Sequence, residues 1–162
     1  MTSWVARYQT YATAERLELR RAVGRRLPAA IGPEDASCLA VLTPAGDALF
    51  GEDVQAALRK AFAALGADFE AVRVVPASRG GDEPRLGWPR ILAWEIELTD
   101  PDLILALGDE PAAALERAWP GGAPPGRRVV VVPDPALALA DPRGKRALWD
   151  ALKGVAGSLP QV

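Results

Sequence analysis

Residues 103–111 are Leu-Ile-Leu-Ala-Leu-Gly-Asp-Glu-Pro. The five apolar residues that begin this segment predict a strand buried on both faces, the kind of strand found in parallel sheets. Gly108 and Asp109 lead directly from this strand into a helix, because Pro111 suits a first helical turn and alanines follow it. A buried strand followed at once by a helix is the repeating unit of an α/β fold with a parallel sheet.

The same alternation of strand and helix extends over the rest of the chain from residue 38. Hydrophobic periodicity predicts further strands at 38–42, 71–75 and 129–132, and helices at 52–65, 89–98 and 142–155. In the last helix, the residues predicted to face inward are Ala147, Leu148, Ala151, Leu152 and Val155. Right-handed crossovers between these elements give a three-layer α/β/α sandwich with a central parallel sheet of about four strands. We expect a ligand site outside the carboxyl ends of these strands.

Residues 1–37 precede this pattern. They are predicted to form an N-terminal helical segment and a linker, and the α/β/α domain is predicted to span 38–162. Thr13 suits the N-cap of a helix at about 14–26, and the stretch 28–37 contains the prolines and glycine that are typical of a linker.

Charge is distributed unevenly along the chain. The formal net charge is −2, but residues 1–26 have a net charge of +4 and the remaining residues one of −6. The basic N-terminal segment permits contact with nucleic acid. The interspersed Glu15 and Glu18 fit a solvated helix face equally well.

Two residue types limit the chemistry available to this chain. It has no histidine and a single cysteine, Cys38. This composition excludes Ser-His-Asp and Cys-His nucleophiles, His-ligated metals, a disulfide within the chain and a four-cysteine iron–sulfur cluster. We therefore expect no metal and no cofactor. No apolar run approaches the roughly 18 residues of a membrane span, and the N-terminus lacks a signal-peptide pattern, so we expect a cytoplasmic protein without membrane contact.

Three motifs resemble, in order and spacing, those of the uracil-DNA glycosylase superfamily between residues 39 and 155. Segment 95–108, which ends in Ala-Leu-Gly before an alanine-rich helix, is similar to the family's E-x-x-L-x-x-P helix and A-L-G strand. Residues 132–149 are similar to its H-P-S/A … P-x-x-K-R-x-x-W ending, and residues 42–45 to its G-x-A-P-G/A loop. The resemblance implies the glycosylase fold, with pocket and motif residues at Thr43, Pro44, Ala45, Gly108, Pro135 and Ala136. A flipped base needs an aromatic side chain to stack on, for which Phe50 and Trp88 are candidates, although ordinary packing explains both.

The catalytic groups of this family are replaced here. The resemblance implies a histidine that donates a hydrogen bond to the departing uracil, but the matching residue is Asp134, whose negative charge would oppose the developing anion. Leu42 stands where the iron–sulfur branch has a glutamate that handles water. If the chain is active, Glu52 or Asp47 would activate water, and Asp134 would be protonated or would contact a different base. The helix dipole also favours an acid in the first helical turn, which explains Glu52 without a catalytic role.

The loops at the expected ligand site are predominantly acidic. Their charged residues are Asp47, Asp82, Glu83, Asp109, Glu110 and Asp134 against Arg79 and Arg85. This sign disfavours a polyanion, so contact with DNA through this rim is expected to be weak.

We therefore expect a non-catalytic protein that serves as an interaction or scaffold subunit in DNA replication or repair. The psi subunits of the bacterial DNA polymerase III clamp loader resemble glycosylases that lack active residues, and their ending is similar to residues 135–149. Aromatic and Arg side chains typical of interfaces predict partner binding at Trp4, Arg7, Tyr8 and Tyr11. Packing on the domain's own surface explains these residues equally well. The alternative function is an active uracil- or damaged-base DNA glycosylase with altered residues.

Overall fold

The computed structural model describes residues 30–44, 48–77, 87–119 and 126–162. The predicted N-terminal helix therefore lies outside the described residues. So do six of the predicted site residues, which are Trp4, Arg7, Tyr8, Tyr11, Ala45 and Asp47.

The described residues form one parallel sheet with the strand order β2-β1-β3-β4. The strands are β1 (Cys38–Leu42), β2 (Arg73–Pro76), β3 (Leu103–Leu107) and β4 (Arg128–Val132). The central strands β1 and β3 are buried along their whole length. Continuous apolar runs have this environment when a strand lies inside a parallel sheet that is covered on both faces.

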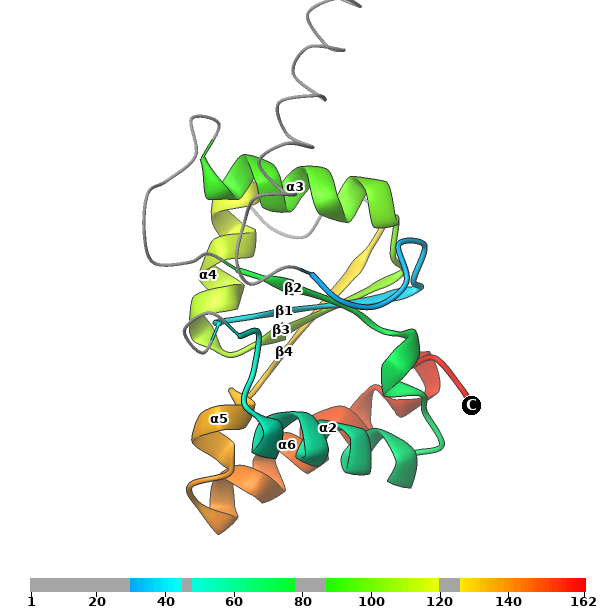
Figure 1. The fold of residues 1–162 in the computed structure, drawn as a ribbon, viewed down its shortest axis with the longest axis vertical. Coiled ribbons are helices and arrows are strands. Elements are labelled where there is room, and N and C mark those ends of the chain that lie inside the picture. Colours follow the sequence, from blue (N-terminus) through cyan, green and yellow to red (C-terminus); the bar gives the residue numbers. More distant parts are fainter. Residues whose placement is uncertain (1–29, 45–47, 78–86, 120–125) are drawn as a thin grey trace, which may run out of the picture.

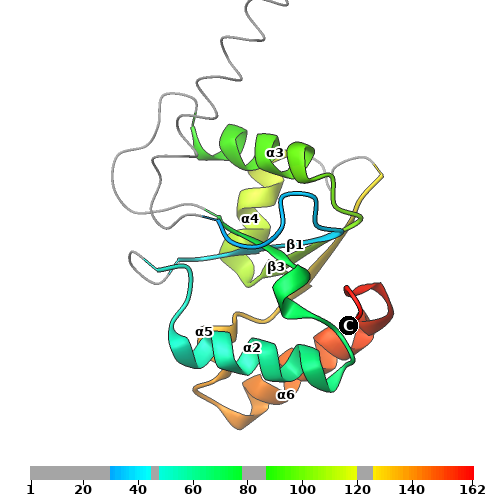
Figure 2. The ribbon, with the colours of Figure 1, turned by 45° about the vertical axis from the view of Figure 1, so that its right-hand side comes forward.

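Helices formed by the described residues cover both faces of the sheet. They are α2 (Glu52–Ala64), α3 (Trp88–Thr99), α4 (Asp109–Ala118), α5 (Pro135–Ala138) and α6 (Pro142–Gly154). Helices α3 and α4 lie on one face, and α2, α5 and α6 lie on the other (Figure 1). The turned view in Figure 2 shows α2 and α6 side by side. The predicted α/β class is confirmed, with an all-parallel sheet of four strands between two helical layers.

Strand β2 begins later than predicted. The reason is a short 3-10 helix, η1 (Phe69–Ala71), which uses the start of the predicted strand. At its N-cap, the carboxylate of Asp68 accepts a hydrogen bond from the backbone N–H of Glu70 at 3.0 Å. A local side-chain cap thus holds Ala71 in a 3-10 turn. Val72 is extended, but it precedes the first residue of β2.

The C-terminal region also differs from the prediction. The four-residue helix α5 was not predicted, and a second 3-10 helix, η2 (Ala156–Ser158), follows α6. The inward orientation predicted for Ala147 is wrong, since this residue is exposed. Leu148 and Leu152 form the buried side of α6, and Ala147 precedes Leu148 by one residue, or about 100° around the helix.

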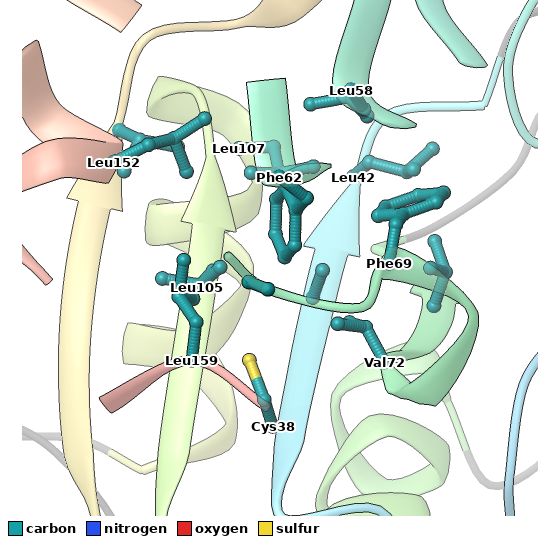
Figure 3. Close-up of a cluster of buried hydrophobic side chains, with 14 of the residues drawn as sticks. Cys38, Leu42, Leu58, Phe62, Phe69, Val72, Leu105, Leu107, Leu152 and Leu159 are labelled. Atoms are coloured by element: carbon teal, nitrogen blue, oxygen red, sulfur yellow. The ribbon is translucent and has the colours of Figure 1, made fainter. Parts of the chain in front are cut away.

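The larger hydrophobic core lies between the sheet and the layer of α2 and α6. Leu58 and Phe62 of α2, Leu152 of α6 and Leu105 of β3 point into this core (Figure 3). The ring of Phe62 packs edge-on against that of Phe69, with ring centroids 5.2 Å apart. A second cluster joins the other face of the sheet to α3 and α4.

The winding of the chain reverses between β1 and β3. From β1 the chain passes through α2 to β2 at one edge, and from β3 it passes through α4 to β4 at the other edge. Helices α2 and α4 lie on opposite faces of the sheet. The connections that leave β1 and β3 therefore diverge, and such a switch point is where open α/β sheets bind ligands.

Part of the predicted linker is attached to the sheet. Ile31 forms an antiparallel bridge with Val74 of β2, with N···O distances of 3.0 and 2.8 Å. The guanidinium of Arg73 donates a hydrogen bond to the carbonyl of Gly32 at 2.7 Å, and Ala36 is buried. Ile31, Gly32 and Ala36 thus attach this segment to the domain, and Ile31 occupies the outer edge of β2.

The buried thiol of Cys38 predicts a loss of stability at high pH. Its side chain is 0% exposed, and burial raises its pKa from 9.0 to about 12, because an apolar interior disfavours the thiolate. Below pH 9 both states keep the proton, so this contribution is fully present. As the pH rises from 9 toward 12, only the unfolded state releases the proton, and the free energy of unfolding falls.

At pH 10 this fall should amount to about 1.4 kcal/mol, measured by urea unfolding. Cys38→Ala removes the titrating thiol and leaves the other ionisable groups in place. The free energy of unfolding of this variant should therefore lack this fall at high pH. Identical pH profiles for the two proteins would mean that the thiol is not desolvated.

Candidate functional site

A pocket of about 200 Å³ lies at the carboxyl ends of β1 and β3, where the winding reverses. Leu42 and Thr43 at the end of β1 and Leu107 at the end of β3 line one part of it. The remaining walls come from the start of α2, from the residues just before it, and from the segment that follows β4. The pocket therefore occupies the place that the strand–helix pattern predicts for a ligand site.

The start of α2 contributes one carboxylate. Asp53 lines the pocket, and its Oδ1 accepts a hydrogen bond from the backbone N–H of Val54 at 2.9 Å. Glu52, the acid predicted to activate water, is exposed and does not line the pocket. Successive helical residues project about 100° apart, so neighbouring acids face different directions. Asp53, which is also exposed, is therefore the acid of this turn that lines the pocket.

Asp134 is the other acid of the pocket, and it caps α5. Its Oδ1 accepts a hydrogen bond from the backbone N–H of Ala136 at 2.9 Å. The residue is half-buried and lies against Gly108 at the end of β3: a β-carbon placed on Gly108 would be 3.1 Å from that of Asp134. Gly108 has a φ of +119°, a conformation that favours glycine and allows this close approach.

Most of the motif residues that the structure describes lie at the pocket. Thr43, Phe50, Pro135 and Ala136 line it, and Gly108 adjoins it through Asp134. Pro44 is half-buried and does not line it. The described part of the motif prediction thus converges on one cavity.

Sequence reasoning missed most of the apolar lining. Leu49, Val54 and Leu58 line the pocket together with Leu107. Val54 and Leu58 lie one turn apart at the start of α2, and Leu107 is the last residue of β3. The predicted ends of the strands and the predicted start of the helix at 52–65 could have indicated these lining residues. The carboxyl ends of neighbouring parallel strands meet at one edge of a sheet, where a ligand site is expected.

The chemistry of the pocket suits an apolar group that bears a positive charge or a hydrogen-bond donor. Asp53 and Asp134 are the ionisable residues in its described lining, which contains no Lys, Arg, Asn or Gln. Each carboxylate accepts a backbone N–H, so both are oriented as acceptors. An anion bound here would meet two negative charges without a compensating cation.

Other kinds of site find little support in the described part of the chain. No cluster of His, Cys, Asp and Glu there has the size to hold a metal ion. No helix in the described ranges has the length and apolarity required to cross a membrane. Comparisons with protein-family models and with curated proteins found no match to this chain.

Proposed function

We propose that this chain is a non-catalytic domain of the uracil-DNA glycosylase type that serves as a protein-interaction subunit in DNA replication or repair. The proposal combines the motif resemblance of residues 39–155 with the character of the pocket. Excision of a base requires groups that stabilise the negative charge developing on the departing base. The described lining of this pocket is apolar and acidic instead.

The observation that supports this proposal most strongly is the hydrogen bond of Asp134. The motif resemblance implies the histidine donor of the glycosylases at this position, whereas the Asp134 carboxylate accepts a hydrogen bond from the backbone N–H of Ala136. Loss of one such donor lowers the rate by a factor on the order of 10²–10³. A carboxylate in its place adds repulsion, and its role as a helix cap explains why an acid is useful there without catalysis.

A second candidate function, base excision with altered residues, is favoured by one observation. Phe50 and Asp53 both line the pocket. An aromatic ring for stacking and a carboxylate for activating water are groups that an enzyme acting on a flipped base needs. In this candidate, Asp53 takes the water-activating role that was predicted for Glu52 or Asp47.

The proposed function is tested by two measurements on the full-length chain. The first is single-turnover release of uracil from a single-stranded oligonucleotide, with the protein in large excess. We expect wild type, Asp53→Ala and the control Asp102→Ala, an exposed acid outside the pocket, to give the same background. If wild type and Asp102→Ala release uracil and Asp53→Ala does not, the proposal is overturned and the second candidate function is established.

The second measurement is binding to purified DNA polymerase III clamp-loader proteins. We expect binding that weakens at least about tenfold when Trp4, Tyr8 and Tyr11 are all replaced by Ala, because aromatic anchors dominate interface energies. Failure of the wild-type chain to bind would contradict the clamp-loader-like role. Equal binding by the triple variant would exclude these aromatic residues as the contact surface.

A further inference from the structure

The two edges of the sheet differ in how they are covered. At the β2 edge, Ile31 pairs with Val74 through two backbone hydrogen bonds. At the opposite edge, β4 pairs with β3 on its inner side, and no backbone hydrogen bond between described residues engages its outer side. An uncovered edge presents unpaired N–H and C=O groups that can pair with another strand.

The register of β4 identifies the groups that point outward. The N–H of Arg128 donates to the carbonyl of Asp102, which precedes β3, at 3.0 Å. Because alternate residues of a strand direct their backbone groups to opposite sides, Val130 and Val132 also point toward β3. The N–H and C=O groups of Val129 and Val131 therefore point away from the sheet, giving two donors and two acceptors.

The side chains of this edge are unusually apolar for a strand whose outer side pairs with no other described segment. Four consecutive valines form β4 after Arg128, and Val131 is 52% exposed. Exposed edge strands are normally protected by charged side chains, by proline or by a bulge. Here Arg128 and Pro133 stand only at the two ends, so the middle of the edge is an apolar strand.

We infer that the β4 edge is a homodimer interface, in which β4 of one chain pairs antiparallel with β4 of a second copy. With Val130 opposite Val130 of the second copy, Val129 of each chain lies opposite Val131 of the other. Each of these two pairs exchanges two N–H···O bonds, so both outward donors and both outward acceptors of each chain are used. The valine side chains also meet one another, and β-branched residues pair well across strands.

The covered β2 edge explains why such an assembly stops at two chains. Pairing through β4 joins two four-stranded sheets into one, whose two outer edges are both β2. Ile31 occupies each of those edges, so a third chain finds no second edge that the described residues leave unpaired. The contact is therefore isologous and closed, the commonest symmetry of homo-oligomers. This inference is independent of the proposed function, since it uses none of the pocket residues.

The oligomeric state of the full-length chain tests the inference. A single strand pair gives a small interface, so we expect reversible association. Sedimentation analysis across a wide concentration range should show a mass that rises from 17.2 kDa toward twice that value. In parallel, hydrogen exchange of the Val129 and Val131 amides should slow as the concentration rises. A monomer at every concentration would overturn the inference.

Substitutions at Val131 separate edge pairing from other contacts. Val131→Pro removes an outward donor and leaves the bonds to β3 in place, because proline is tolerated at an edge. Val131→Lys retains the donor but adds a charge that opposes edge pairing. Both variants should weaken dimerisation about tenfold or more, whereas the control Val131→Thr, which retains the N–H and the β-branched shape, should dimerise like wild type.

Far-UV circular dichroism establishes that each variant is folded. If Val131→Pro fails to fold, Val131→Lys decides the question alone. Dimerisation of folded Val131→Lys at wild-type strength would contradict an interface at β4.

Discussion

Phe62→Ala is expected to lower the free energy of unfolding by about 3–5 kcal/mol, one of the two largest effects that we predict for a single substitution. Phe62 is 2% exposed and lies in the core between α2 and the sheet. Its ring also contacts Phe69 edge-on, with an interplanar angle of 73°. Truncation therefore removes buried apolar surface, leaves a cavity and abolishes an aromatic pair. Urea unfolding followed by circular dichroism measures the loss.

Leu98→Ala is the matched control, since Leu98 is 61% exposed on α3. Its effect should stay within about 0.5 kcal/mol. A double-mutant cycle with Phe69→Ala isolates the aromatic contact, for which we expect a coupling of about 0.5–1.5 kcal/mol. If Phe62→Ala were no more destabilising than Leu98→Ala, the result would contradict the burial of Phe62 between α2 and the sheet.

The central strands could be predicted from the sequence because one feature determines them. Continuous apolar runs at 38–42 and 103–107 coincide with the limits of β1 and β3, and a strand buried on both faces needs such a run. The limits of β2 depended on a competition between local conformations. The cap formed by Asp68 stabilises η1, which ends at Ala71, the first residue of the apolar run that predicted the strand, and the apolar pattern alone does not reveal this local cap.

The candidate site was predictable where motif and strand end coincide. Thr43 follows β1 and Asp134 follows β4, and both line the pocket. The choice between Glu52 and Asp53 depended on the rotation of α2 about its axis, which the first turn of a helix does not reveal. The attachment of Ile31 to β2 involves a single bridge, and one pair of residues has no periodicity to detect.

Gly108→Ala should be the other strongly destabilising substitution, and it connects the fold with the pocket. Gly108 has φ +119° and ψ 178°, a region occupied almost only by glycine, and another residue held there costs about 1–3 kcal/mol. The added methyl group would also lie 3.1 Å from the β-carbon of Asp134. Together we expect a loss of about 2–4 kcal/mol in the free energy of unfolding, measured by urea unfolding.

Two glycines serve as controls that separate strain from crowding. Gly126 has φ +77°, and no atom of the described residues lies within 4 Å of the place that an added methyl group would take. Gly126→Ala therefore tests backbone strain alone and should cost about 1–2 kcal/mol. Gly157 has neither a positive φ nor a close neighbour among the described residues, so Gly157→Ala should be nearly neutral. If Gly108→Ala were no more destabilising than Gly126→Ala, the additional loss that we expect from crowding against Asp134 would be contradicted.

The position of Asp134 provides a second measure of the Gly108→Ala effect. Movement of Asp134 away from the new methyl group would stretch its bond to Ala136 N–H, so the Ala136 amide should exchange faster with solvent than in wild type. The Val54 amide, which is bonded to Asp53, a lining residue that is not in contact with Gly108, should change less. A larger change at Val54 than at Ala136 would contradict the packing of Gly108 against Asp134. Faster exchange confined to Ala136 would show that the turn after β3 holds the cap of α5 in place.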